Sequence, residues 1–250
     1  MSLKTIMIAL AAIAALTMSP ASQAQQVLRA GTNPAGAPIS FLDSKSNTYR
    51  GVSIELMAEI AKDAGFQVEY SPMTLAELIP ALNSNKIDII VANMLATPER
   101  KALIDFSEPY HASGDALVVT KADTKQYKSI VDLKGMVIGT QKGSAQLTAI
   151  QKTGLFPEVK LYDNFVAVMR DVSAGGIAAG IVGRTAARYQ LHLGNFPDLR
   201  IVTSYQPMIE SGDAFGVRKG DSELLRRINA SLVKLQANGT LAKILANYGL

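Results

Sequence analysis

Apolar runs alternate with helically spaced apolar positions along most of this chain. In the helix predicted at 51–64, the apolar residues recur three and four positions apart, at Leu56, Met57, Ile60, Ala61 and Ala64. A first series predicts strands at 27–32, 66–71 and 87–91, with helices at 51–64, at 75–82 and from Thr97. A second series predicts strands at 136–140, 159–162 and 177–182, with helices at 144–152, at 165–173 and from Arg184. This alternation predicts an α/β protein whose strands are mainly parallel.

Two extended apolar segments, 113–119 and 213–217, flank the second series. Each is suited to crossing between two lobes, and the helices predicted at 221–236 and 240–247 would return to the first lobe. We therefore predict two α/β lobes, each a mainly parallel sheet flanked by helices. The predicted ranges are 25–114 with 211–250 for lobe 1, and 115–210 for lobe 2.

Residues 1–24 do not belong to this pattern. Lys4 precedes an apolar run at 5–16, and Ser22-Gln23-Ala24 places small residues where a signal peptidase requires them. These features predict a secretory signal peptide cleaved after Ala24. The apolar run is shorter than the roughly 20 residues of a transmembrane helix. Because the chain has no cysteine, we expect no lipid-anchored N-terminus and predict a soluble periplasmic protein.

Charge and motif content exclude several function classes. The 25 basic and 21 acidic residues are interspersed, which argues against a nucleic-acid partner. The two histidines, His111 and His192, are far apart and without cysteines, so we expect no metal site. The glycine-containing turn at 139–144 has the order Lys-Gly-Ser, which differs from a phosphate-binding loop. We expect no cofactor.

Arg100 is the strongest candidate for ligand chemistry. Thr97 can cap a helix, Pro98 suits its first position, and Glu99 favours the positive end of the helix dipole. A guanidinium placed there could hold a carboxylate, or could pair with a neighbouring acid on a surface helix. Arg100 and Arg184 each follow the third strand of their series. Since ligands bind beyond the carboxyl ends of such strands, we expect both side chains to face one cleft.

Seven motifs together carry a family resemblance. They lie at 78–82, 86–88, 97–101, 105–110, 132–135, 217–220 and 238–244. With these motifs the chain resembles the periplasmic solute-binding proteins of polar amino acid ABC importers. The resemblance implies the two-lobed type II periplasmic binding protein fold, joined by two crossing strands and closing over a small carboxylate-bearing ligand. It also implies a monomer that delivers its ligand to an ABC permease in the inner membrane.

The resemblance also implies site residues. In this family the arginine of the motif at 97–101 holds the ligand's α-carboxylate, and Arg100 matches it. Ser144 matches the donors at the start of a second-lobe helix. The predicted ligand-binding set is Asn33, Asn93, Leu95, Arg100, Gln141, Ser144, Ala145 and Arg184.

Other positions depart from the family pattern. An acid expected after the first strand is Asn33, a threonine expected five residues before the arginine is Leu95, and the second-lobe aspartate that holds the α-ammonium is Arg184. The aromatic residues that wall the ligand pocket in the family are replaced by Gly36 and Val52. The usual ammonium acceptors are therefore missing.

Two interpretations of these departures stay open. An unpaired buried ammonium beside Arg184 would be disfavoured by desolvation and by like charge, so the ligand could be an organic acid or dicarboxylate held by Arg100 and Arg184. Alternatively, Arg184 points to solvent or pairs with Glu77 or Glu210, and another acid accepts an ammonium.

Two other function classes are alternatives to a solute-binding protein. A dehydratase-like enzyme on the same fold, acting on a prephenate-like acid, would need an acid or base in the cleft, and Arg184 argues against it. The sensing module of a receptor is the third possibility. We predict a binding protein without catalytic residues.

Overall fold

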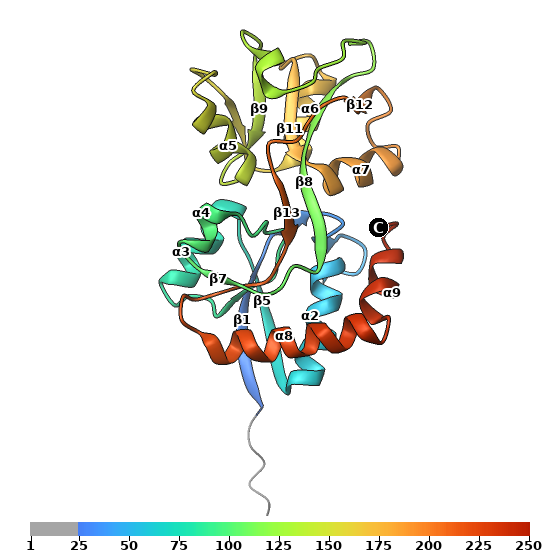
Figure 1. The fold of residues 1–250 in the computed structure, drawn as a ribbon. Coiled ribbons are helices and arrows are strands. Elements are labelled where there is room, and N and C mark those ends of the chain that lie inside the picture. The colour runs from blue at the N-terminus through green and yellow to red at the C-terminus, as the bar shows by residue number, and fades with distance from the viewer. Residues whose placement is uncertain (1–24) are drawn as a thin grey trace, which may run out of the picture.

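The computed structural model describes residues 25–250, which form two main sheets flanked by helices (Figure 1) and a third, small sheet. The predicted signal peptide at 1–24 lies outside the described residues. Within residues 25–250, no helix combines the length and apolar character needed to cross a membrane.

The first sheet has the strand order β5-β1-β6-β14-β7. Strand β1 runs parallel to β5 and β6, whereas β14 is antiparallel to both β6 and β7. The strands are β1 (Gln26–Thr32), β5 (Phe66–Pro72), β6 (Ile89–Ile90), β7 (Asp105–Phe106) and β14 (Gly216–Val217). The helices of this lobe are α2 (Val52–Ala64), α3 (Leu75–Asn83), α4 (Pro98–Lys101), α8 (Ser222–Ala237) and α9 (Thr240–Ala246).

The second sheet has the order β10-β9-β11-β8-β12, with β13 also paired to β8. Strand β9 is parallel to β10 and β11, and β8 is antiparallel to its neighbours. The strands are β8 (His111–Thr120), β9 (Ile138–Gln141), β10 (Lys160–Tyr162), β11 (Ala179–Gly183), β12 (Leu199–Ile201) and β13 (Glu210–Asp213). The helices are the 3-10 helix η1 (Ile130–Leu133), α5 (Ala145–Thr153), α6 (Phe165–Ser173) and α7 (Arg184–His192).

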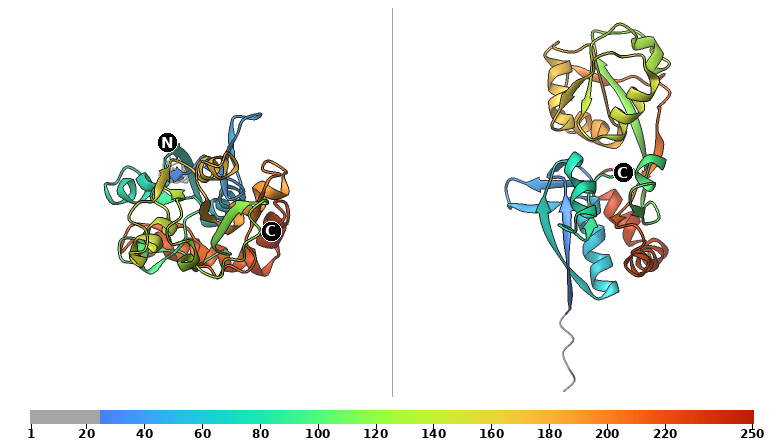
Figure 2. Two further views of the ribbon diagram at one scale, coloured as in Figure 1. Left: turned by 90° about the horizontal axis from the view of Figure 1, so that it is seen from above. Right: turned by 90° about the vertical axis from the view of Figure 1, so that its left-hand side faces the viewer.

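Strands β8 and β13 cross between the lobes (Figures 1 and 2). They pair antiparallel, from Glu210 opposite Gly114 to Asp213 opposite His111. The first predicted crossing, 113–119, lies within β8. The second begins earlier than predicted, because β13 starts at Glu210 and its pairing with β8 extends the crossing toward the second lobe.

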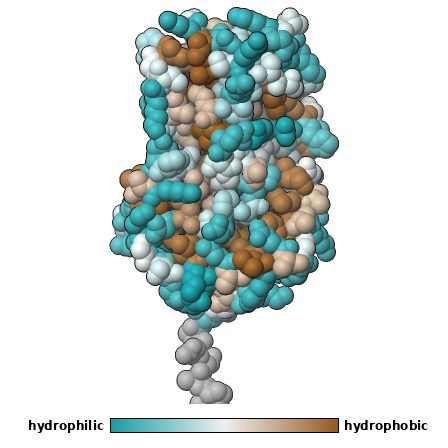
Figure 3. Space-filling model, in the orientation of Figure 1, coloured by the Kyte–Doolittle hydropathy of each residue, from teal (hydrophilic) through white to brown (hydrophobic). Residues whose placement is uncertain are grey.

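Helix α2 shows how the apolar pattern produces the fold. Leu56, Met57 and Ile60 are fully buried, and they belong to one core cluster with Phe66 of β5 and Leu232 of α8. Spacing of three and four residues places these side chains on one helix face, so burying that face fixes the helix against the sheet. On the molecular face shown in Figure 3, the remaining hydrophobic residues form separate patches among hydrophilic ones.

Two features of the fold were not predicted from the sequence. The sheets are mixed because β8 and β14 run antiparallel to the parallel strands that they join. A small antiparallel sheet is formed by β2 (Ala35–Gly36), β3 (Ser40–Asp43) and β4 (Thr48–Arg50). These strands, like β7 and β12, are too short to give a clear alternating pattern.

Candidate functional site

Arg100 lies on the single turn of α4, after β6 in the first lobe. Thr97 precedes this turn in an extended conformation, its hydroxyl oxygen accepts the Arg100 N–H at 3.5 Å, and Pro98 occupies the first helical position. The predicted helix start is therefore present, but the helix has only four residues. A single turn provides little helix dipole, so the chemistry of this position belongs to the guanidinium group itself.

The guanidinium of Arg100 links the two lobes. Its Nη1 donates to the Leu95 carbonyl in the first lobe at 3.0 Å, and its Nη2 donates to the Gly143 carbonyl in the second lobe, also at 3.0 Å. Arg100 is 8% exposed, and this burial lowers its pKa to about 10, so the group stays charged at neutral pH. A buried cation bonded to neutral carbonyls is well placed to take an anion.

Further contacts hold the two lobes together around Arg100. Gly143 has φ +68°, and a Cβ atom there would lie 2.5 Å from Cα of Ala76 in α3. Nearby, Lys152 of α5 forms an ion pair with Glu99 of α4, and this hydrogen bond lowers the pKa of Glu99 to about 2. In this arrangement α3 lies against the loop before α5, and α4 is ion-paired to the last turn of α5.

A small cavity lies where the lobes meet at Arg100. Its volume is about 30 Å³, enough for about one water molecule. Its lining from the first lobe is Leu75, Asn93, Leu95 and Arg100, and its lining from the second lobe is Gln141, Ser144, Ala145, Gln146, Phe165, Gly183 and Ala186. A solute larger than water requires the lobes to separate before it can be admitted.

The second-lobe wall is the start of α5. Ser144 caps this helix, since its Oγ accepts the Leu147 N–H at 3.1 Å, and Thr140 Oγ1 lies 3.4 Å from the same oxygen. Gln141 Nε2 donates to the Asp163 carbonyl at 3.3 Å. Capping leaves other N–H groups of the first helical turn without intrahelical acceptors, and the residues of this turn, Ala145 and Gln146, line the same cavity as Arg100.

Asn93, Leu95, Arg100, Gln141, Ser144 and Ala145, all predicted from the sequence, are brought together at this cavity. Asn33 is buried but has another role. Its Oδ1 accepts the Ala35 N–H at 3.0 Å and its carbonyl accepts the Ser40 hydroxyl at 2.9 Å. These two bonds tie the end of β1 to the small sheet, and Asn33 does not line the cavity.

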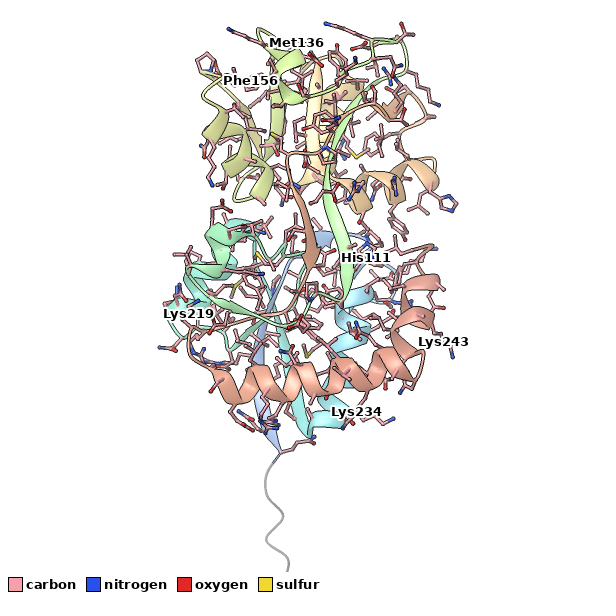
Figure 4. The ribbon with its side chains drawn as sticks, viewed as in Figure 1. His111, Met136, Phe156, Lys219, Lys234 and Lys243 are labelled. Atoms are coloured by element: carbon pink, nitrogen blue, oxygen red, sulfur yellow. The ribbon has the colours of Figure 1, made fainter. Side chains whose placement is uncertain are left out.

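Arg184 is also absent from this cavity, contrary to the expectation that both arginines face one cleft. Its Nη1 and Nη2 donate to the two carboxylate oxygens of Glu210 on β13, at 2.9 and 2.7 Å. It lines a separate cavity of about 440 Å³ with His111, which Figure 4 labels on β8. The turn from β11 into α7 places Arg184 beside the crossing strands, where Glu210 is its nearest acid. Of the two interpretations drawn from the sequence, the structure has the one in which Arg184 pairs with Glu210.

Asp213 is the main feature that the sequence analysis missed. It is 2% exposed, and its Oδ2 is buried without a hydrogen-bond partner. Burial raises its pKa to about 7, against the opposing attraction of the Arg100 charge. Its backbone forms an isolated antiparallel bridge with Leu95, which lines the cavity. The available signal was an acid at the start of the predicted apolar crossing at 213–217.

Comparison with known proteins gives consistent matches over most of the chain. The family model for bacterial extracellular solute-binding proteins, family 3, matches residues 28–250. The ABC transporter arginine-binding protein 1 of Escherichia coli K12 is 31% identical over 204 residues, covering 80% of this chain and 81% of that protein.

Two solved structures are also similar. An ancestral arginine-binding protein bound to arginine matches at a TM-score of 0.81 and 34% identity, covering 90% of this chain and 98% of that one. The ancestral amino acid-binding protein AncCDT-1, a precursor of cyclohexadienyl dehydratase, matches at a TM-score of 0.78 and 31% identity, covering 89% of this chain and 95% of that one. The predicted two-lobed fold is confirmed by these structures and by the two sheets.

Proposed function

Because this chain belongs to the bacterial extracellular solute-binding proteins of family 3, we propose that it captures an amino acid-type solute between its lobes for an ABC importer. The carboxylate of the solute would be held by Arg100. The observation that carries this proposal is the burial of Arg100 at the lobe junction, with its side-chain donors on two neutral carbonyls. A bidentate carboxylate would replace these acceptors with a charge-assisted pair.

We propose that two rigid bodies move during capture, residues 25–114 with 211–250 and residues 115–210. The hinge would be the paired crossing strands β8 and β13. The cavity of about 30 Å³ supports this, since a solute would have to enter while α5 is farther from α4. Solute that touches both lobes when they meet would shift the equilibrium toward the closed arrangement.

The proposed setting is the periplasm, without a lipid anchor, where the protein acts as a monomer and delivers solute to an inner-membrane permease. Relatives named as histidine-, cystine- and arginine-binding proteins support an amino acid as the solute class. With Arg184 paired to Glu210, the argument for a dicarboxylate loses its second cation. An organic acid as the solute is therefore kept as an alternative for the binding screen to test.

The decisive experiment is identification of the solute. Mass spectrometry of small molecules retained by the purified protein would be combined with a thermal-shift screen of amino acids and organic acids. We expect one amino acid or a small group of them to stabilise the protein, and Arg100→Ala to abolish the effect. Stabilisation by dicarboxylates alone would overturn the amino acid assignment.

We further propose binding without turnover. The residues that line the cavity at Arg100 include no aspartate, glutamate or histidine. Asp213 lies behind this lining, bridged to Leu95, and is the buried acid near Arg100 that could act as an acid or base. The relatives named as binding proteins support binding without turnover. Incubation with prephenate followed by chromatography should return prephenate unchanged. Product formation that Arg100→Ala abolishes would favour the dehydratase alternative.

A further inference from the structure

The cavity wall beside Arg100 is rich in oxygen acceptors but contributes no acid. Its polar side chains are Asn93, Gln141, Ser144 and Gln146. Ser144 Oγ caps α5, and Gln141 donates to the Asp163 carbonyl. Asn93 differs, because its Oδ1 is buried without a hydrogen-bond partner.

Asn93 is one of three residues with such an atom among residues 25–250, the others being Thr32 (Oγ1) and Asp213 (Oδ2). The sheet brings all three toward the carboxyl end of β6. Thr32 ends β1, which pairs parallel with β6, and Asn93 follows β6. On the side of β6 opposite β1, the Ala214 N–H donates to the Met94 carbonyl at 3.2 Å. This bond places Asp213 next to the segment that carries Asn93.

Gly36 provides a second observation on Asn93. A Cβ atom at Gly36 would lie 2.7 Å from Asn93 Oδ1, so a side chain at this position would displace the amide. In this chain the space beside Gly36 is taken by the unpartnered amide oxygen of Asn93.

Buried acceptors without partners are unfavourable unless a donor reaches them. An ammonium group brings three N–H donors and a positive charge, whereas a second carboxylate brings neither and would be repelled by ionised Asp213. Arg100 and Asp213 attract each other electrostatically, and Asp213 lies directly behind Leu95 of the cavity lining. Such a pair is complementary to a zwitterion.

We propose that Asp213, with Asn93, receives the ammonium group of the solute whose carboxylate Arg100 holds, and thereby selects zwitterionic solutes over deaminated ones. This inference rests on the proposed function. Asp213 takes the place of the second-lobe acid that the sequence lacks, but it does so from the first-lobe side of the hinge. Its bridge to Leu95, whose carbonyl accepts from Arg100, connects the two halves of the site.

Matched pairs of ligands test this proposal. Titration calorimetry would compare L-arginine with 5-guanidinopentanoate and L-histidine with 3-(imidazol-4-yl)propanoate, which lack only the ammonium group. The same comparison would be made for the tightest-binding amino acid of the screen. We expect Asp213→Asn to weaken binding of the amino acid more than tenfold and to change binding of its deaminated partner less than twofold. Arg100→Ala should weaken both members.

Asp115→Asn is the matched control. Asp115 is another fully buried acid, but it accepts from the Tyr205 hydroxyl at 2.8 Å and from the Ile209 N–H at 2.7 Å. Its substitution should leave the preference between the two members of a pair unchanged. If Asp213→Asn does not fold, Asn93→Ala should show the same selective loss.

The outcomes separate this inference from the proposed function. Equal losses for both members of a pair in Asp213→Asn, or no loss for either, would overturn the role of Asp213 while amino acid binding stands. A wild-type protein that binds neither member of any pair would overturn the proposed function and this inference together.

Discussion

Arg100 combines burial, charge and a position between the lobes in one side chain. Its guanidinium carries a full charge at neutral pH, although burial lowers its pKa to about 10. Its hydrogen bonds reach Leu95 in one lobe and Gly143 in the other. A charge held in this way interacts strongly with an anion because little water screens it.

Replacement of Arg100 by alanine tests this residue directly. We expect Arg100→Ala to cost about 2–5 kcal/mol of solute binding, because it removes a desolvated, hydrogen-bonded partner of the carboxylate. Titration calorimetry measures the loss. Arg100→Lys retains the charge but not the bidentate geometry, so it should retain only part of the affinity. Unchanged affinity in Arg100→Ala would show that the carboxylate lies elsewhere.

Asp213 should make folding stability depend on pH. Its pKa is raised from 3.8 to about 7 by burial, so between these values the folded protein holds a proton that the unfolded chain releases. Its contribution to stability is fully present below about pH 4 and is lost as the pH rises through 7. Asn mimics the protonated carboxyl group, so the variant does not lose this stability as the pH rises. The free energy of unfolding of Asp213→Asn, relative to that of the wild type, should therefore be about 2–3 kcal/mol higher at pH 8 than at pH 5.

Urea unfolding of both proteins at the two pH values measures this difference. Asp115→Asn is again the comparison. Burial also raises the pKa of Asp115, but the hydrogen bonds from Ile209 and Tyr205 oppose this rise, so we expect a smaller pH-dependent difference than for Asp213→Asn. An equal difference between Asp213→Asn and wild type at pH 5 and pH 8 would mean that Asp213 titrates normally.

At the scale of elements, the site depends on the approach of α3 and α4 to α5. The loop before α5 carries Gly143, whose carbonyl accepts from Arg100 and whose Cα faces Ala76 of α3. The loop is closed by the Ser144 cap, which fixes where α5 begins. Space at one backbone position therefore decides how closely the lobes can meet.

Gly143→Ala should weaken solute binding by disfavouring this closed arrangement. A Cβ atom would lie 2.5 Å from backbone Cα of Ala76, and backbone cannot move aside as easily as a side chain. We expect roughly a tenfold loss of affinity, about 1.4 kcal/mol, and a larger radius of gyration in X-ray scattering with solute present.

Gly154→Ala is the control for this prediction. Gly154 has φ +63°, close to the +68° of Gly143, but a Cβ atom there would meet nothing within 4 Å. Both substitutions introduce backbone strain of about 1–2 kcal/mol, so only the interlobe contact differs. Equal affinities in the two variants would show that the lobes bind solute without the close approach at Gly143.

At the scale of the whole molecule, two sheets joined by two paired strands place the site at the junction. The right-hand view of Figure 2 shows the lobes one above the other, with the crossing segments on one side. A hinge on one side leaves the opposite side free to open. Solute bound at the junction, as proposed, would therefore link the two lobes in the folded state.

Solute should stabilise the entire described fold for this reason. At a free concentration 100 times Kd, a ligand that binds only the folded protein adds about 2.7 kcal/mol to its stability. For a chain of this size that corresponds to a rise in Tm of roughly 5–10 °C. Differential scanning calorimetry with the tightest-binding amino acid of the screen measures the rise. Arg100→Ala should show none at the same concentration.

The sequence by itself determined the order of the elements and the position of Arg100. Apolar periodicity predicted α2 at 51–64 and the helix at 165–173, and the structure has them at Val52–Ala64 and Phe165–Ser173. The Thr97 and Pro98 signals placed Arg100 at a helix start that exists, although it is a single turn. These features depend on residues a few positions apart, so the local sequence contains the information.

Only the tertiary structure decided which polar groups meet. Arg184 pairs with Glu210 because β13 returns beside β8 and α7, and Asp213 is buried beside Leu95 because the same strand continues into the first lobe. Both contacts join segments separated by 26 residues or by more than 100 along the chain. Periodicity does not encode such pairings, because they depend on how the crossing strands pack and on which acids that packing removes from water.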